Sequence, residues 1–468
     1  MNPILKNIYD ICPVSFQNVL LNGYSALLDR QRYGGEYKKY RKFMDECQWY
    51  NESDLLKMQE DKLRLLIKHA YNTVPYYREQ FNRRKLTPND IKGIQDLQKL
   101  PLLTRKDIKA NFKKLLSKDF PKNKIKYGHT SGTTGTPLEV AYDHHITYAT
   151  YAALDRHYHW AGVKLSKNGD RVAVLRGNVI VPLSQINGPF WRYNHVHNQL
   201  LLSTFHLSAQ NLPLYLREVE KYRPVVFDGY PSTLYVFAKF LQNERLTLPV
   251  KAVISSSETL YDFQRAVIEK SFQCPVSDYY ALAERVVFAS ECEKHEGHHI
   301  YMDYGITEII NHQDEPVQKG QPGKLVGTSL YNFAMPLIRY VTNDMTAIQN
   351  RKCACGRSLQ LMEDVTTKAE DSLTLRDGRI ISPSVLTHPF KPMDCVEASQ
   401  IIQKEYDRII IKIVPGQNYT DSDAEHLIIE MKLRLGKDMT VDIEIANELE
   451  RTKSGKFRWV VSEIPLGI

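Results

Sequence analysis

The segment Tyr127–Val140 reads Tyr-Gly-His-Thr-Ser-Gly-Thr-Thr-Gly-Thr-Pro-Leu-Glu-Val. Three hydroxyl residues and two glycines fall within Ser131–Gly135, and a further hydroxyl lies on each side, at Thr130 and Thr136. Such a stretch suits neither a helix nor a strand, whereas its hydroxyls and unshielded backbone N–H groups can surround phosphate oxygens. No Gly-Lys-Ser/Thr follows, so it is not a P-loop. We interpret it as a phosphate-binding loop of another kind, with a solvated turn as the alternative.

The composition limits the class of protein. A chain of 468 residues is expected to form two or more domains, and 43% hydrophobic with 25% charged residues is typical of a globular protein. The net charge of +8 is spread along the chain, and we interpret it as a solvated basic surface, with phosphorylated substrates or an anionic membrane surface as the alternatives. No apolar run approaches the ~20 residues of a membrane span. We therefore predict no membrane span, leave peripheral association open, and expect no nucleic-acid partner.

The termini and cysteines bear on the cell compartment. The start, Met-Asn-Pro-Ile-Leu-Lys, lacks a charged region followed by an apolar one, so we expect no signal peptide. The seven cysteines are mostly far apart, which suits a reducing environment. The expected location is the cytoplasm, and the sequence leaves the oligomeric state open.

Two patterns divide most of the chain. Residues 1–125 read as helices with short breaks; Leu55–Tyr71, for example, has helical spacing and is followed by Pro75. From about 126 to 350, short apolar runs such as Val172–Leu175 and Ala252–Ser255 alternate with amphipathic helical stretches. This alternation predicts an α/β fold with mixed but largely parallel sheets, in which helices flank the strands.

The last hundred residues change character. Strand patterns over Val396–Gln403 and Arg408–Val414 precede a helix from about Ser422 to Leu435, with Asp421 as its expected cap, and another strand at Met439–Ala446. This β-β-α-β order predicts a small α+β domain. We place the boundary in the polar segment 366–371, giving a large domain of residues 1–368 and a small one of residues 369–468.

Three further segments become informative beside the phosphate loop. Tyr280-Ala-Leu-Ala-Glu284 follows a short apparent strand, and Arg339–Asp344 places an aspartate just after a turn-like asparagine. Arg451–Arg458 lies in the small domain, with Lys456 on a Ser-Gly turn. Each segment is a weak signal alone, but their order and spacing are specific.

Together these segments resemble the adenylate-forming superfamily of acyl- and aryl-CoA ligases, firefly-type luciferases and peptide-synthetase adenylation domains. The sequence is most similar to the phenylacetate-CoA ligase branch, which includes the CapK-like proteins of polysaccharide gene clusters. The resemblance covers nearly the whole chain, including Leu66–Arg78 and Arg223–Ser232. It implies a small C-terminal domain that acts as a mobile lid.

The family resemblance also implies a reaction. In that family a carboxylate attacks the α-phosphate of Mg-ATP, which gives an acyl-AMP and pyrophosphate, and a thiol, amine or hydroxyl then displaces AMP. Both reactants are anionic, so hydrogen-bond donors and Mg²⁺ must neutralise charge at the α-phosphate. Thr136 stands where many relatives have Lys or Arg. By resemblance, the β- and γ-phosphates would be held by Thr130, Ser131, Gly132, Thr133, Thr134 and Gly135.

Further residues receive roles from the same resemblance. Glu284 occupies the position that contacts Mg²⁺, Tyr280 would lie against the adenine, and Asp344 would accept the ribose hydroxyls. Ser257 and Glu258 would belong to the loop beside the adenine. A buried structural carboxylate is the alternative for Glu284, and an unremarkable surface aspartate is the alternative for Asp344.

The small domain would supply a mobile cation. Lys456 would contact the carboxylate and the α-phosphate and withdraw when the domain rotates, or else it is a solvated lysine on a glycine turn. Lys368 stands where relatives have an arginine before the hinge, and Glu370 matches the hinge position itself. Lysine keeps the charge but loses the bidentate fork of arginine, so rotation of the domain is less firmly indicated than adenylation.

Cysteines and a histidine in two segments indicate a metal site. Cys353-Ala-Cys355 is a tight thiolate pair, Cys292 adds a third sulfur, and the following Gly-His-His run offers an imidazole. Three sulfurs and one nitrogen suit tetrahedral Zn²⁺. The resemblance to the phenylacetate-CoA ligase branch selects His299 among the nearby histidines. Four protein ligands would leave no open position, so we expect a structural zinc, with three buried thiols and a surface histidine as the alternative.

The resulting hypothesis is an ATP-dependent adenylate-forming ligase that acts on an acyl or aryl carboxylate. CoA is the default acceptor, and a sugar, an amine or a carrier-bound thiol stays open because of the CapK-like resemblance. One alternative is nucleotidyl transfer that ends in an AMP adduct, as in deazaflavin-adenylating synthetases. Another is a catalytically weak scaffold of a polysaccharide assembly complex. The pocket for the acid cannot be read from the sequence.

Overall fold

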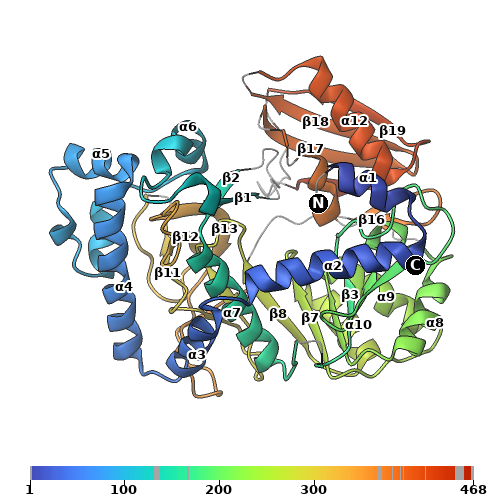
Figure 1. The fold of residues 1–468 in the computed structure, drawn as a ribbon, viewed down its shortest axis with the longest axis horizontal. Coiled ribbons are helices and arrows are strands. Elements are labelled where there is room, and N and C mark those ends of the chain that lie inside the picture. The colour runs from blue at the N-terminus through green and yellow to red at the C-terminus, as the bar shows by residue number, and fades with distance from the viewer. Residues whose placement is uncertain are drawn as a thin grey trace.

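Figure 1 shows the fold of the chain as a computed structural model. The structure describes residues 3–130, 138–165, 168–311, 313–365, 372–381, 383–390, 392–393, 395–416, 418–447, 449 and 458–464. The first part of the chain is helical, as predicted. Its helices are α1 (Pro3–Ile11), α2 (Val14–Arg32), α3 (Tyr37–Cys47), α4 (Glu52–Thr73), α5 (Pro75–Arg83) and α6 (Arg105–Leu115), with short 3₁₀ turns at Pro88–Asp90, Ile94–Lys99 and Lys122–Lys124.

Local sequence signals set the ends of these helices. The side chain of Asn51 accepts a hydrogen bond from the N–H of Asp54 at 2.9 Å and caps α4, which ends just before Val74 and Pro75. The proline becomes the first residue of α5, where its missing N–H costs nothing. Helix α6 begins after Thr104, whose N–H donates to the Asp107 carboxylate at 2.9 Å.

A nine-stranded sheet forms the centre of the large domain, in the order β14-β10-β9-β8-β7-β6-β3-β5-β4. The strands from β8 to β5 are parallel and the outer ones are antiparallel, so the predicted parallel core lies within a mixed sheet. The strands are β3 (Val172–Leu175), β4 (Trp191–Asn194), β5 (Gln199–Leu202), β6 (Val226–Gly229), β7 (Ala252–Ser256), β8 (Val276–Ala281), β9 (Phe288–Ser290), β10 (His298–Ile300) and β14 (Leu361–Met362).

Helices cover both faces of this sheet. Val172 and Val174 of β3 belong to one core with Tyr158 of α7 (His144–Trp160), whereas Ala173 and Leu175 belong to another. That second core is built with α8 (Leu212–Tyr222), α9 (Pro231–Asn243) and α10 (Asp262–Phe272). Strands buried on both faces read as continuous apolar runs, which explains their pattern in the sequence.

Two smaller sheets complete the large domain. Strands β11 (Gly305–Ile310), β12 (Gly323–Ser329) and β13 (Tyr340–Thr346) form an antiparallel sheet. Strands β1 (Lys126–His129) and β2 (Glu139–Tyr142) form a hairpin on either side of the predicted phosphate loop. The predicted α/β class, with mixed sheets flanked by helices, is confirmed.

The C-terminal unit contains the predicted β-β-α-β order, one more strand in the same sheet and a separate short hairpin. Its sheet has the order β19-β18-β17-β20 and packs on α12 (Asp421–Leu435). Thr420, not Asp421, caps this helix, because its N–H donates to the carboxylate of Asp423 at 2.9 Å. The other elements of this unit are β15 (Leu373–Thr374), β16 (Ile380–Ile381), α11 (Pro383–Leu386), β17 (Val396–Glu405), β18 (Arg408–Pro415), β19 (Thr440–Ile445) and β20 (Val460–Ser462), with a 3₁₀ turn at His388–Phe390. One more 3₁₀ turn, Thr204–His206, follows β5 of the large sheet.

The C-terminal unit packs onto loops that follow strands of the large sheet. Phe205 of the large domain belongs to the C-terminal core, and Val179 and Tyr230 pack against it. The unit therefore lies above the carboxyl ends of the parallel strands (Figure 1). The predicted boundary at 366–371 falls outside the described residues and stays a prediction.

Candidate active site and metal centre

The phosphate-loop prediction falls on the connection between β1 and β2. Thr130 donates from its N–H to the carbonyl of Leu138 at 3.0 Å, and its hydroxyl accepts from the N–H of Leu138 at 3.0 Å. These bonds join the two ends of the segment 131–137, which lies outside the described residues and holds Ser131, Gly132, Thr133, Thr134 and Gly135.

Glu284 lies on a chain of contacts that starts at this hairpin. The guanidinium of Arg105 donates to the Thr130 hydroxyl at 3.1 Å and also interacts with Tyr340. The Tyr340 hydroxyl donates to the Glu284 carboxylate at 2.7 Å. Burial and then the Glu284 charge raise the pKa of Tyr340 well above 10, so the phenol stays a neutral donor. Tyr142 of β2 donates to the carbonyl of Ala283 at 2.5 Å, which fixes the backbone beside the carboxylate.

Tyr280 and Asp344 meet across two sheets. Tyr280 lies on β8 and Asp344 on β13, and the Tyr280 hydroxyl donates to the Asp344 carboxylate at 2.6 Å. Burial and the Asp344 charge raise the pKa of Tyr280, so the phenol is neutral. The two residues assigned by resemblance to adenine and ribose therefore share one location, although their nucleotide roles stay predictions.

Ser257 and Glu258 follow β7 at the carboxyl end of the sheet. Ser256 pairs with Tyr279 of β8, so Ser257 leaves the sheet beside the start of the Tyr280 segment. Its φ of 72° is in the left-handed region. The Glu258 carboxylate accepts from the N–H of Ser232 at 3.1 Å, at the N-terminus of α9, where a negative charge is favourable.

A charged side chain that was not predicted from the sequence lies at the same end of the sheet. Arg176 directly follows β3; it donates to Asp228 at 2.9 Å and to the Ser256 hydroxyl at 2.9 Å. Its guanidinium lies 5.7 Å from the ring centre of Tyr230 and 5.9 Å from that of Tyr279. A charged residue at the carboxyl end of a doubly buried parallel strand is a signal that could have identified it, because ligands of open α/β sheets bind there.

Two further predicted site residues, Lys368 and Lys456, also lie outside the described part of the chain, as Ser131–Gly135 do. The structure therefore brings together, around the sheet ends and the β1–β2 hairpin, Thr130, Ser257, Glu258, Tyr280, Glu284 and Asp344.

The four predicted metal ligands form one cluster. The sulfurs of Cys292, Cys353 and Cys355 and a ring nitrogen of His299 all lie within 4.8 Å of one another. The Cys292 and Cys353 sulfurs are 3.6 Å apart, and the Cys355 sulfur is 3.4 Å from His299 Nε2. Zinc–sulfur bonds of ~2.3 Å in a tetrahedron place two sulfurs ~3.8 Å apart, so the donor set and its spacing fit Zn²⁺.

The charge state of the cluster also fits a metal. Burial, helped by Arg357, lowers the pKa of His299 to about 4, so its imidazole is neutral, the form that binds a cation. Burial raises the pKa of Cys353 to about 11. Without a metal these buried thiols stay protonated and neutral, and binding of a metal ion converts them to thiolates.

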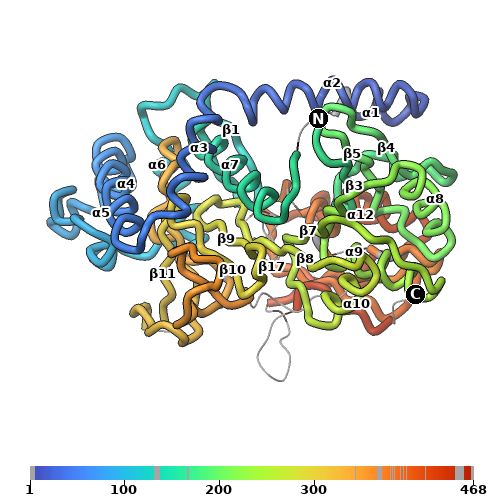
Figure 2. The backbone as a smooth tube through the Cα atoms, turned by 90° about the horizontal axis from the view of Figure 1, so that it is seen from below, coloured from blue at the N-terminus to red at the C-terminus, as the bar shows by residue number. Residues whose placement is uncertain are grey.

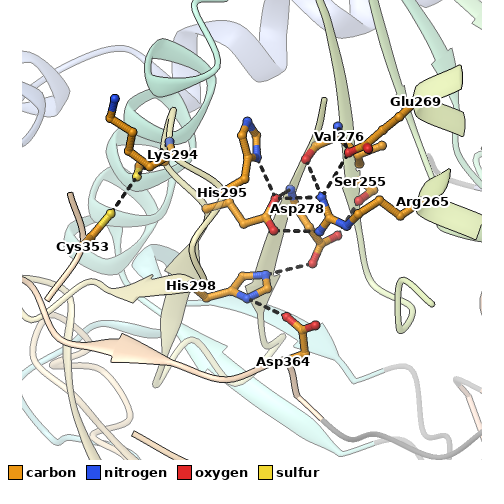
Figure 3. Close-up of polar contacts among 12 residues, drawn as sticks. Ser255, Arg265, Glu269, Val276, Asp278, Lys294, His295, His298, Cys353 and Asp364 are labelled. Atoms are coloured by element: carbon orange, nitrogen blue, oxygen red, sulfur yellow. Dashed lines mark hydrogen bonds and ion pairs between the residues drawn. The ribbon is translucent and has the colours of Figure 1, made fainter. Parts of the chain in front are cut away.

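The neighbouring histidine has a different role (Figure 3). His298 lies 3.0 Å from the Asp278 carboxylate and 3.3 Å from that of Asp364. Burial opposes its charge, but these carboxylates raise the pKa of His298 to about 10, so it is an imidazolium. Glu291 extends the network through Arg265 at 2.7 Å. This ion-pair network ties β10 to β8 and to Asp364, which follows β14.

The fold resembles that of adenylate-forming CoA ligases. A solved 2-hydroxyisobutyryl-CoA ligase in complex with 2-HIB-AMP and CoA superimposes with a TM-score of 0.57 at 18% identity, covering 89% of this chain and 91% of the other. Residues 373–463 match the family model described as the CapK C-terminal domain. Protein CapK of Staphylococcus aureus is 28% identical over 98% of this chain and 100% of its own length. Phenylacetate-coenzyme A ligase of Aromatoleum evansii is 26% identical over 89% and 96%, respectively.

These comparisons confirm the resemblance to the phenylacetate-CoA ligase and CapK-like branch, and they support the predicted enzyme class of an ATP-dependent adenylate-forming ligase. They leave the acid and the acceptor unspecified. Among the described helices, none has the length and apolar character needed to cross a membrane.

Proposed function

We propose that this protein activates a carboxylate as an acyl-AMP at the expense of ATP and transfers the acyl group to an acceptor. The observation that carries the proposal is the convergence of the Thr130 hairpin, Glu284 and the Tyr280–Asp344 pair at one end of the sheet. The similarity to phenylacetate-CoA ligases over most of the chain supports the same activity.

The described residues suggest how the site would work. A carboxylate oxygen of the acid would form a bond to the α-phosphorus while pyrophosphate leaves with the electrons of the broken P–O bond. Glu284, oriented by Tyr340, would hold the Mg²⁺ that accompanies ATP, and Asp344, oriented by Tyr280, would receive the ribose hydroxyls. Mg²⁺ would neutralise charge on the phosphates. Ser131–Gly135 and Lys456 are proposed to surround the same triphosphate.

Polar side chains near the sheet ends suggest the kind of acid. The Arg176–Asp228 pair and Ser256 lie beside the loop of Ser257, and the buried Ser232 hydroxyl has no hydrogen-bond partner among the described residues. Buried polar groups are normally paired, so we propose that the acid carries a hydroxyl or second anionic group that pairs with them.

The acceptor is proposed to be CoA first, because the relatives named above include CoA ligases. A sugar, an amine or another thiol is the next candidate, because the chain is also similar to CapK.

We also propose that a structural Zn²⁺ is held by Cys292, His299, Cys353 and Cys355. The spacing of the four ligand atoms and the neutral imidazole of His299 support this proposal.

The test is pyrophosphate release from Mg-ATP with a panel of carboxylates, followed by mass spectrometry of the product with and without CoA. Lys456→Ala should abolish release, whereas Lys437→Ala, at an exposed position of the same unit, should leave it unchanged. An AMP adduct would support nucleotidyl transfer instead. A protein that binds no ATP and releases no pyrophosphate with any acid would overturn the proposal and favour a scaffold.

A further inference from the structure

Polar side chains of helix α2 face inward and contact strand β4 and the residue after it. The side-chain oxygen of Asn18 accepts from the N–H of Tyr193 at 3.0 Å, and the side-chain amide of Asn22 donates to the carbonyl of Tyr193 at 2.8 Å. The Asn22 oxygen also accepts from the N–H of His195 at 2.7 Å. Gln17, which is buried, accepts from Arg192 at 2.7 Å. Leu21 also packs inward, against the core beneath.

The sheet edge explains this orientation. Strand β4 is the last strand of the nine-stranded sheet, so one side of its backbone has no neighbouring strand. Unpaired backbone N–H and C=O groups need partners, and an asparagine side chain offers one donor end and one acceptor end. Helix α2 therefore takes the place of a missing strand at Tyr193, and covering the edge also prevents pairing with other chains.

The opposite side of the hairpin α1–α2, here called the outer face, is apolar. On α2 it exposes Phe16 (49%), Val19 (63%), Tyr24 (42%) and Leu27 (64%), at helical spacing, and α1 also exposes Ile8 and Ile11. No other described helix exposes more than two large apolar side chains. Large apolar surfaces left exposed on one face mark a site of interaction. Figure 2 shows α1 and α2 lying along one edge of the molecule.

Positive charge lies near one end of the outer face. Arg30, in the last turn of α2, is exposed, whereas Arg32 in the same turn lies over the Tyr151 ring at 5.0 Å. Lys126 donates to the side chain of Gln31 at 2.9 Å, which places a third cation beside this turn. The carboxylates in the hairpin have cationic or histidine neighbours: Asp10 lies 2.7 Å from the Lys6 ammonium, and Asp29 lies 3.5 Å from His197.

We propose that the outer face of α1–α2 lies flat on a membrane surface that contains anionic lipid. An apolar stripe with cations at its edge is the pattern of an interfacial helix, and α2 offers a nearly straight length of ~28 Å at 1.5 Å per residue. A second copy of this face is less suitable, because the first turn of α2, which would meet Arg30 and Arg32 in an antiparallel pair, has no acidic residue. The proposal is independent of the acid and the acceptor.

The test uses the full-length protein and flotation with phosphatidylcholine vesicles that contain or lack about a third of phosphatidylglycerol. The protein should bind the anionic vesicles, bind neutral ones less, and dissociate as salt is raised. Phe16→Ser/Leu27→Ser should weaken vesicle binding at least about tenfold, because the favourable free energy of transferring each apolar side chain from water into the lipid is lost. These positions leave Asn18 and Asn22 intact, so circular dichroism should show an unchanged fold.

Leu56→Ser/Leu65→Ser on α4 is the matched control, since both leucines are exposed away from the hairpin and the variant should bind like the parent protein. Equal vesicle binding by the Phe16/Leu27 variant, or no binding by the parent protein, would overturn the proposal. So would a dimer in light scattering that the Phe16/Leu27 variant loses, because this result would assign the face to a second copy.

Discussion

Replacing both Cys353 and Cys355 by serine should remove the bound zinc and destabilise the large domain. The cluster joins positions that lie 61 residues apart, Cys292 and Cys353. The chain-entropy relation for a cross-link of that length gives about 4 kcal/mol at 25 °C. Free zinc at about 1,000 times its Kd contributes a similar stabilisation, about 4 kcal/mol.

That loss should be visible as a shift in thermal unfolding. An unfolding entropy of ~2.1 cal/mol/K per residue over the whole chain makes 4 kcal/mol equal to a fall in Tm of about 4 °C if unfolding is cooperative. Metal content by mass spectrometry and Tm by calorimetry are the measurements. A strong chelator should produce the same shift in the parent protein and none in the double variant.

Cys12→Ser is the matched control, because Cys12 is a free thiol outside the cluster, and it should keep both zinc and Tm. If the purified parent protein holds no zinc when supplied with it, or if the double variant binds as much as the parent, the metal reasoning fails. A fall in Tm without any bound metal would indicate that the thiols act only as core residues.

Three shorter predictions follow from the same structure. Tyr340→Phe removes the hydrogen bond to the buried Glu284 carboxylate, so the Mg²⁺ concentration that half-saturates pyrophosphate release should rise. The free energy of unfolding should fall by about 2 kcal/mol. An unchanged Mg²⁺ dependence would contradict the role of Glu284. Asp303→Asn leaves the fully buried Arg156 without its ion-pair partner, which should cost about 3–5 kcal/mol in urea unfolding, whereas an Arg156→Met/Asp303→Leu double variant should lose less. Arg176→Met should shift the preferred acid toward apolar ones while the KM for ATP stays constant, and a parallel loss with every acid would refute a role in selection.

Much of the site was predictable because its chemistry is local in sequence. The Ser/Thr/Gly run and the cysteine pair each indicate a candidate function within a few residues, and the structure places Cys292 and His299 beside the pair. The structure places His299, the histidine that the resemblance selected, in the cluster, and its role as a ligand stays a prediction. Its neighbour His298 points to Asp278 and Asp364 on the other side of β10.

Contacts between distant residues were not predictable. Tyr340 reaches Glu284 across 56 residues, and Tyr280 reaches Asp344 across 64. The position of Arg176 after an apolar strand could be read from the sequence, but its partner Asp228 was set only by the pairing of β3 with β6. No local pattern encodes such partners, because sheet order and register decide which strand ends become neighbours.

The amino-acid sequence alone predicted many of the helices and strands, the α/β class, the resemblance to adenylate-forming ligases and a candidate ligand set for a metal. Tertiary structure alone decided which side of α2 faces inward. Hydrophobic periodicity shows that a helix has an apolar side, and such a side normally packs on the core. Here the unpaired backbone of β4 selects the side with Asn18 and Asn22, because buried N–H and C=O groups must be paired, and the apolar side is left outside.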